Sequence, residues 1–326
     1  MDLRPPKTTM KTRRWGVARV VALGVAAVLV SGFGAACAST RSRAAAGSPE
    51  RVEVASQTRY GRVLLADSAT HIEKAHPDAV VVAGSFAGAA TAAYPLRAGV
   101  RGLILHEAGV GRNRAGISGL GLAERFGVPM AAVQTMSARI ADGASVYRGR
   151  VAHANRPAAA LGVRPGMSTR EAADLMLGAA PGRPLDVGEV ADPREHVVHR
   201  GDDGNVVAVW SISLVEGERR GDVFCVASHA GVTMAGFARS VRPRGIIAND
   251  AGMARDQSGI AGLQALGRQG VPAAAVGALT AEIGDGRSTH RDGIISATNE
   301  AAERLGVRVG QPAAEAARLM LGAPRG

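Results

Sequence analysis

The stretch Pro243–Ser288 reads PRGIIANDAGMARDQSGIAGLQALGRQGVPAAAVGALTAEIGDGRS, and it carries the clearest structural signal in the chain. Two continuous apolar runs, Gly245–Ala248 and Val271–Val276, flank the segment Ser258–Gly267, whose apolar residues recur at helical spacing. Continuous apolar runs are typical of strands covered on both faces, and a helix between two such strands is typical of a parallel sheet. The stretch therefore predicts a strand–helix–strand unit of an α/β domain.

The same pattern occurs earlier in the chain, where Val100–Ser145 reads VRGLILHEAGVGRNRAGISGLGLAERFGVPMAAVQTMSARIADGAS. A shift of 143 residues places Gly109 on Gly252. One residue is then inserted in the second copy, and a shift of 144 places Asn155 on Asn299. Matches of this kind continue over about 120 positions, as expected for a duplicated domain. Because two copies are too few for a solenoid, we expect two homologous domains that pack together as a pseudo-dimer.

Within each copy, strand-like segments alternate with helix-like segments. In the second copy, Val206–Ile212 and Val223–Ala227 have the composition of strands, and Ala230–Ser240 is helix-like. Two further helices are expected at Gly293–Leu305 and Pro312–Leu321. This alternation predicts an α/β fold of two homologous tandem domains, each a largely parallel sheet flanked by helices.

Changes in composition divide the chain into five segments. Residues 1–38 have the pattern of an export signal or membrane anchor, and residues 39–50 that of a flexible tether. The first α/β repeat is expected at residues 51–180 and the second at 196–326. Residues 181–195 between them are rich in proline, as in a linker.

The N-terminal segment predicts export. Basic residues at Lys11–Arg14 precede the apolar run Trp15–Ala36, which is the order found in signal peptides. Residues 34–37 read GAAC and resemble a lipoprotein box, which makes Cys37 a candidate for lipidation. Ordinary cleavage near Cys37, or retention of the run as a membrane anchor, fits the same residues. We expect a protein of the cell envelope that is membrane-anchored, a lipoprotein or secreted.

Composition limits the class of partner. The 326 residues carry a net charge of +11, but only 3% of them are aromatic. Much of the positive charge lies in the first twenty residues, and the remainder interleaves arginine with acidic residues. Because this pattern offers neither a basic block nor a base-stacking surface, we expect no nucleic-acid partner. Two cysteines cannot form a disulfide framework, and Cys225 lies in an apolar run that predicts burial.

Two resemblances bear on the fold. The run GIIANDAG, followed by a small-residue helix and GVPAAAV, is similar to swivelling β/β/α domains, including the phosphohistidine domains of phosphoenolpyruvate-utilising enzymes. Their histidine falls near Gln257-Ser258, where this chain has none, so the likeness implies a fold and no activity. The unit also resembles an uncharacterised bacterial α/β repeat family with motifs of the G-S-x-x-G, N-D-A-G and D-G-R-S type.

Candidate site residues follow the predicted strands, because ligands of parallel α/β sheets bind at the carboxyl ends of the strands. Ser85 and its counterpart Ser228 each follow a strand and precede a glycine-containing turn. Each serine fits an N-cap and also fits an anion-binding helix start. His229 beside Ser228 adds a third interpretation, an activated serine nucleophile in one copy alone.

The next strand end carries His106-Glu107 in the first copy and Asn249-Asp250 in the second. Asp250, Glu107 and His106 are candidates for acid–base catalysis, and Asn249 for hydrogen bonding to a polar ligand. The structural alternative is that the carboxylates accept N–H bonds from the following turn. The chain has no HxxxH, HxH or Cys/His spacing, so we expect no metal site.

A third group lies in the loop after the last predicted strand of each copy. The first copy offers Arg139 and Asp142, and the second offers Asp285, Arg287 and Ser288. The Asp-Gly pairs are typical of turns, and the arginines suit a carboxylate or phosphate ligand. Each copy keeps a different arginine, which is compatible with two degenerate sites or with one composite site between the domains.

We therefore expect an exported protein that acts on a small anionic metabolite, with a hydrolase-like enzyme as the first hypothesis. The alternative is a non-catalytic ligand-binding or structural protein of the envelope. The chain has no Walker loop, dinucleotide fingerprint, GxSxG elbow or HExxH motif, so no cofactor is expected. The sequence leaves the oligomeric state open.

Overall fold

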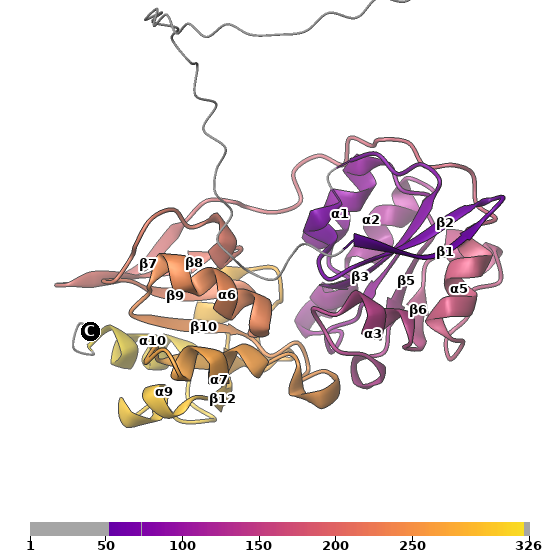
Figure 1. Cartoon of the computed structure of the whole chain (residues 1–326). Helices are drawn as coiled ribbons and strands as arrows, with labels where there is room; N and C mark the ends of the chain where they lie inside the picture. Colours follow the sequence, from indigo (N-terminus) through magenta and orange to yellow (C-terminus); the bar gives the residue numbers. More distant parts are fainter. Residues whose placement is uncertain (1–51, 73, 323–326) are drawn as a thin grey trace, which may run out of the picture. The chain divides into compact units, whose positions relative to one another are not determined.

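The computed structural model describes residues 52–72 and 74–322, which all belong to one structural unit. They form two six-stranded sheets, each flanked by helices (Figure 1). The predicted export segment, the tether and Cys37 lie outside the described residues. None of the described helices is long and apolar enough to span a membrane.

The first repeat contains six strands, five α-helices and three short 3-10 helices. The strands are β1 (Val52–Thr58), β2 (Gly61–Ala66), β3 (Ala79–Phe86), β4 (Gly102–His106), β5 (Met130–Val133) and β6 (Val151–Ala154). The helices are α1 (Ala89–Ala98), α2 (Gly119–Arg125), α3 (Gly143–Tyr147), α4 (Arg156–Ala160), α5 (Thr169–Met176), η1 (Ala69–His71), η2 (Arg112–Ile117) and η3 (Thr135–Ser137).

The second repeat has the same order of main elements. Its strands are β7 (His196–Gly201), β8 (Gly204–Val209), β9 (Val223–His229), β10 (Gly245–Asn249), β11 (Ala273–Val276) and β12 (Ile295–Thr298). Its helices are α6 (Val232–Val241), α7 (Ala261–Gly267), α8 (Gly286–Arg291), α9 (Glu300–Arg304), α10 (Ala313–Leu321), η4 (Ile212–Leu214) and η5 (Arg255–Gln257).

The two sheets have the same topology. Strands follow one another in chain order, β1 to β6 in the first sheet and β7 to β12 in the second. The four central strands of each sheet are parallel, and the outermost strand at each edge is antiparallel. The carboxyl ends of β2 to β5, and likewise of β8 to β11, therefore lie along one edge of their sheet, where ligand sites form in such folds.

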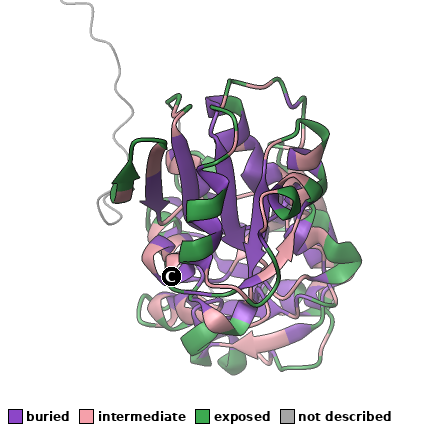
Figure 2. Cartoon of the chain, turned by 90° about the vertical axis from the view of Figure 1, so that its right-hand side faces the viewer, coloured by how far each residue is buried: buried purple, intermediate pink, exposed green. Residues whose placement is uncertain are grey.

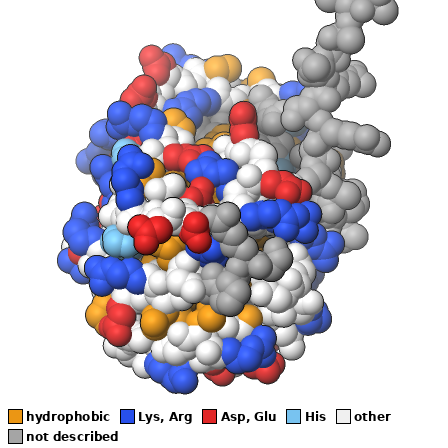
Figure 3. Space-filling model, turned by 90° about the vertical axis from the view of Figure 1, so that its left-hand side faces the viewer, with side chains coloured by type: hydrophobic (Ala, Val, Ile, Leu, Met, Phe, Trp, Pro, Cys, Tyr) orange, Lys and Arg blue, Asp and Glu red, His pale blue; other side chains and the backbone are white. Residues whose placement is uncertain are grey.

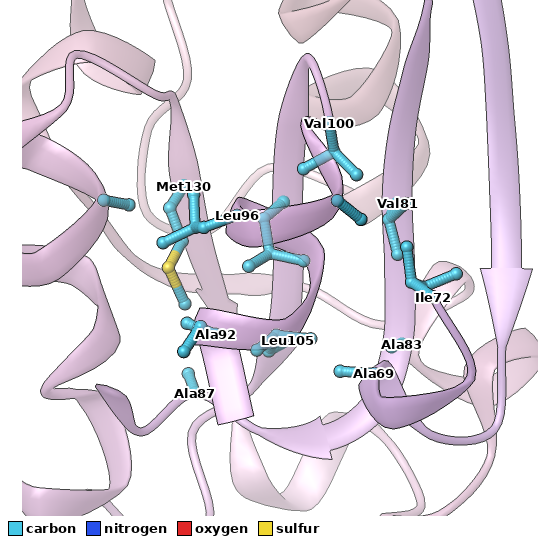
Figure 4. Close-up of a cluster of buried hydrophobic side chains, with 14 of the residues drawn as sticks. Ala69, Ile72, Val81, Ala83, Ala87, Ala92, Leu96, Val100, Leu105 and Met130 are labelled. Atoms are coloured by element: carbon cyan, nitrogen blue, oxygen red, sulfur yellow. The ribbon is translucent and has the colours of Figure 1, made fainter. Parts of the chain in front are cut away.

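Alternate residues of each central strand fill two hydrophobic layers, one on each face of the sheet. In the first repeat, Val81 and Leu105 face Leu96 of α1, whereas Val80 and Ile104 face the α3, α4 and α5 side. Figure 4 shows the first of these layers, with Leu96 above the sheet. Figure 2 shows the buried strands of this repeat between helices whose outer faces are exposed. The core is built mainly of alanine and aliphatic side chains, as the low aromatic content predicts.

The predicted fold class is confirmed, with two similar tandem domains of α/β architecture. One predicted helix is wrong. Residues 293–305 form strand β12 followed by the short helix α9. The β-branched segment Ile295–Thr298 pairs antiparallel with β11, and the side chain of Asn299 caps α9 by accepting the N–H of Ala302. Pairing with the sheet edge thus overrides the helix-like composition of the segment.

The segment after α5 covers the amino-terminal ends of the first repeat's strands. Gly182 donates its N–H to the carbonyl of Pro77 at 2.7 Å, and Val187 is buried in the core layer beneath α1. Gly99, which ends α1 with a left-handed φ of +81°, leaves room for the chain, because a Cβ there would lie 2.5 Å from Pro184 N. The first part of the predicted linker, as far as Val187, therefore packs against the first repeat, whereas Glu195 at its end pairs with Arg219 of the second.

Candidate functional site

The carboxyl ends of the strands meet where the two repeats contact each other. A Cβ added at Gly252 would lie 2.7 Å from the Cα of Gly109, its counterpart in the first repeat. Next to this backbone contact, a small apolar cluster joins the repeats. Its buried members are Phe86, Ala108, Ile140, Ala251, Ala254 and Ile283. Polar contacts continue the junction, including an ion pair of 3.3 Å between Arg139 and Asp256.

His106 and Asn249 fasten the end of a strand to the loop beside it. Nδ1 of His106 accepts the N–H of Ala108 at 3.0 Å, and Nε2 lies 3.1 Å from the carbonyl of Ala138. The side chain of Asn249 repeats both bonds, to Ala251 and Ala281, whose positions correspond. Both residues are fully buried. Because both polar ends of each side chain are occupied by the backbone, these residues act as structural links.

The neighbouring carboxylates also bind backbone N–H groups. Oδ1 of Asp250 accepts N–H bonds from Gly252 and Ala278, at 2.8 and 2.9 Å. In the first repeat Oε1 of Glu107 accepts the N–H and hydroxyl of Thr135, at 2.8 and 2.9 Å. Asp250 thus binds the turn that follows it, as in the structural alternative, whereas Glu107 binds Thr135 in the loop after β5 and not its own following turn.

A pocket of about 310 Å³ lies between the repeats at the ends of β2, β3, β8 and β9. It brings together three of the predicted site residues, Ser85, Ser228 and His229. Its lining consists almost entirely of counterpart residues from the two repeats. The eight pairs are Asp67/Trp210, Ser68/Ser211, Thr70/Ser213, His71/Leu214, Ser85/Ser228, Phe86/His229, Thr91/Met234 and Tyr94/Phe237. We call it the paired pocket.

Hydroxyl groups and aromatic rings dominate this lining. The serine hydroxyls of each repeat make short local contacts, such as 2.8 Å between Ser68 and Thr70 and 2.8 Å between Ser211 and Ser213. The rings of Tyr94 and Trp210, one from each repeat, stack with centroids 6.1 Å apart and an interplanar angle of 20°. The pocket thus combines an apolar wall with groups that both donate and accept hydrogen bonds.

The two serines predicted as site residues differ in their bonding. Ser85 is buried, and its hydroxyl accepts the N–H of Ala69 at 2.9 Å, which fixes the chain after β2. The hydroxyl of Ser228 has no hydrogen-bond partner among the described residues and lines the pocket. Ser228 is therefore the serine available to a ligand.

His229 is held in one tautomer. Its Nδ1 accepts the N–H of Gly231 at 3.1 Å, so a neutral ring carries its proton on Nε2. Burial, together with repulsion from His106, lowers the pKa of His229 to about 4. At neutral pH the ring is uncharged and can donate one hydrogen bond from Nε2, but it cannot act as the base for Ser228 through Nδ1.

The predicted loop residues lie outside the paired pocket. Arg139 and Asp142 line a cavity of about 250 Å³, whereas Asp285 and Arg287 line another of about 190 Å³. Asp142 and Asp285 cap α3 and α8, each by accepting a backbone N–H. Ser288 is fully buried; its hydroxyl accepts the N–H of Glu282 and donates to Asp292. The structure does not bring Arg139 and Arg287 into one cavity.

Several pocket residues were missed by sequence reasoning, above all the aromatic pair Tyr94/Phe237 on α1 and α6. The amino-acid sequence nevertheless contained an indication of this pocket. The sequence has only five Phe, three Tyr and two Trp, and four of these residues, Phe86, Tyr94, Trp210 and Phe237, line this one pocket. In a chain so poor in aromatics, two aromatics at matching positions of the repeats indicate a shared surface.

Neither a metal-binding cluster nor a reactive cysteine occurs among the described residues. Among residues 52–72 and 74–322, no cluster of His, Cys, Asp or Glu side chains has the arrangement to hold a metal ion. Cys225 is fully buried in β9, and burial raises the pKa of its thiol to about 12, so the reactive thiolate does not form at neutral pH.

No protein-family model matches the chain, and neither a curated protein nor a solved structure gives a significant match.

Proposed function

We propose that this protein binds a small uncharged molecule in the paired pocket, one that presents hydroxyl or amide groups along one edge and an apolar face along the other. The observation that carries this proposal is the lining itself. Hydroxyls from both repeats face the space beside the stacked rings of Tyr94 and Trp210. Aromatic walls with a few polar groups are the usual composition of small-molecule sites, and about 310 Å³ is at the small end of their range.

Charge favours an uncharged ligand over the anion expected from the sequence. No lysine or arginine is among the described residues that line the paired pocket, and Asp67 contributes a carboxylate. An anion would therefore be desolvated beside a negative group without a cationic partner, which is unfavourable.

Binding without turnover is the better supported activity. The candidate acid–base groups Asp250 and Glu107 are occupied by backbone N–H bonds and do not line the pocket. Hydrolysis is a second candidate because the unpartnered hydroxyl of Ser228 lines the pocket, but the tautomer of His229 leaves that serine without a neighbouring base.

The test is a thermal-shift screen of the full-length protein against uncharged polyols, sugars and nucleosides and against carboxylated and phosphorylated metabolites. A ligand at a hundred times its Kd stabilises the native state by about 2.7 kcal/mol, which raises Tm by a few degrees. Ser228→Leu should abolish the shift because it fills the pocket. Ser240→Leu, the same change at an exposed position of α6 outside the lining, should preserve it.

Two results would contradict the proposal: stabilisation by no uncharged compound of the panel, or a hit that survives Ser228→Leu unchanged. Catalysis requires a separate measurement, because stabilisation reports binding alone. Incubation of the confirmed ligand with the protein, followed by detection of product, distinguishes a hydrolase from a binding protein.

A further inference from the structure

A second concave surface lies at the opposite, amino-terminal ends of the second repeat's strands. This groove has a volume of about 530 Å³ and is bordered by the end of α6, the start of β10, the loop before β11 and helix α9. Five arginines line it: Arg220, Arg239, Arg242, Arg244 and Arg304. We call it the arginine groove. Figure 3 shows the side of the molecule that bears this repeat, with many basic and some acidic side chains.

The groove carries an excess of positive charge. Arg220 and Arg242 share one acidic partner, Glu218, at 2.9 and 3.2 Å, and Arg304 pairs with Glu300 at 2.7 Å. Neither glutamate lines the groove, and no other acidic residue among the described ones does. Arg239 and Arg244 form no ion pair within the described chain. Because the three ion pairs are exposed to solvent, they hold their arginines weakly and an incoming anion can compete for them.

Arg244 is held in a fixed position at the edge of the groove. Its side chain is about nine-tenths buried, and one guanidinium nitrogen donates to the carbonyl of Leu321 at 2.6 Å. Its Nε is shielded from solvent and has no hydrogen-bond partner in the described chain. Its counterpart Arg101 is buried to the same extent, donates to the equivalent carbonyl of Leu177 and also has an unpartnered Nε, so these contacts belong to the fold that the repeats share. What Arg244 adds to the groove is a fixed positive charge without a counter-ion in the described chain.

Comparison with the first repeat shows that four of the five charges are specific to the second, since only Arg244 has an arginine, Arg101, at the equivalent position. The counterparts of four groove arginines are uncharged: Pro77, Leu96, Gly99 and Ala160 stand where Arg220, Arg239, Arg242 and Arg304 occur. In the first repeat the linker covers this surface, through the bond from Gly182 to Pro77 and the burial of Val187. The arginines thus gather on the copy of the surface that the linker leaves uncovered.

We propose that the arginine groove binds a phosphate-bearing anion with at least two negative charges. Guanidinium groups pair with phosphate oxygens through two parallel N–H···O bonds, and several arginines around one cavity match the several oxygens of such a ligand. The groove is independent of the paired pocket, since the two surfaces lie at opposite ends of the strands and share no lining residue.

The test is calorimetric titration of the full-length protein with inorganic pyrophosphate at about 0.15 M salt, where surface charges are screened over about 8 Å. The double variant Arg239→Gln/Arg304→Gln should raise the Kd at least tenfold. The control Arg114→Gln/Arg170→Gln removes the same charge from exposed positions of the first repeat and should change the Kd less than twofold. An unchanged Tm in both variants verifies that they fold.

A parallel titration with bis(glycerophospho)glycerol, the soluble headgroup of cardiolipin, distinguishes the source of the phosphate, because its two phosphodiesters carry the two negative charges that the proposal requires. Binding of the headgroup as tight as that of pyrophosphate indicates a lipid, and much weaker binding indicates a free phosphorylated compound. The proposal is overturned if pyrophosphate does not bind, or if both double variants weaken its binding equally, because the effect would then reflect overall charge.

Discussion

His106 and Asn249 occupy equivalent positions in the two repeats and make the same pair of hydrogen bonds with different chemical groups. The neighbouring carboxylates belong to Glu107 and Asp250, whose side chains differ in length by one methylene group. In the first repeat, Thr135 compensates for this difference. Its hydroxyl accepts the N–H of Gly109, whereas in the second repeat Oδ1 of Asp250 accepts the matching N–H directly. At the scale of single residues, the duplicated domains thus preserve the hydrogen bonds of the strand ends and exchange the groups that make them.

His229 gives a prediction about pH. Its pKa is about 4 in the folded protein and near 6.5 when unfolded, so between these values the unfolded chain binds more protons. The free energy of unfolding should therefore decrease as the pH falls through this window, by about 2 kcal/mol at pH 5 from this group. Urea unfolding at pH 7.5 and pH 5 measures the difference.

The control for this prediction is His229→Phe, because phenylalanine occupies the equivalent position as Phe86. Between the two pH values, the free energy of unfolding of the variant should decrease by about 2 kcal/mol less than that of the wild type, whatever the variant's absolute stability. An identical loss in both proteins would show that His229 does not titrate as described.

At the scale of elements, the last helices of the repeats differ in how they begin. Ser168 and Glu171 form a capping box at the start of α5, in which each side chain accepts the other's backbone N–H. Helix α10 has Pro312 at the corresponding position and no side-chain cap. In α10 neither bond of the box is needed, because Pro312 has no N–H and the N–H of Glu315 donates to the carbonyl of Pro312 at 3.1 Å.

Ser168→Ala should therefore lower the free energy of unfolding by about 1 kcal/mol, as measured by urea denaturation. Ser168→Thr retains both the acceptor at the cap and the hydroxyl that donates to Glu171, and it should recover most of the loss. If the threonine variant is as unstable as the alanine variant, the loss has a cause other than the cap.

The elements that could be predicted from the sequence are those with an uninterrupted local pattern. The continuous apolar runs of β9, β10 and β11 predict strands directly, and the alignment of the two repeats predicts the equivalent strands of the first copy. Strand β12 could not be predicted, because its four residues become a strand only by pairing with β11. Three residues of the paired pocket, Ser85, Ser228 and His229, were candidates from the sequence and lie at the ends of β3 and β9. Tyr94 and Phe237 lie on helices, and only contact between the repeats brings them to the pocket.

At the scale of the whole molecule, the junction depends on two glycines. Gly252 has a φ of +68° and approaches the backbone of Gly109, so a side chain would be strained and would also collide. The loops around both glycines hold further residues at positive φ, among them Val110 and Met253 at matching positions. Conformations of this kind persist where surrounding packing holds them, and here the partner repeat supplies the packing.

Gly252→Ala tests this junction against Gly217→Ala. Gly217 has a similar φ of +70° but open space around its Cα. Its substitution should therefore lower the free energy of unfolding by about 1 kcal/mol, from backbone strain alone. Gly252→Ala should cost about 2 kcal/mol more, because a methyl group must displace the opposing backbone. Chemical denaturation measures both. Equal losses would mean that the contact between the glycines contributes nothing to holding the repeats together.

The paired pocket has a consequence for how the proposed ligand would bind. In a dimer of identical chains, a pocket on the two-fold axis presents the same groups from both sides, so an asymmetric ligand has two equivalent poses. Here Asp67 opposes Trp210 and His71 opposes Leu214. Duplication within one chain has let the halves diverge, so a ligand with unlike ends has a single preferred direction and a stoichiometry of one per chain.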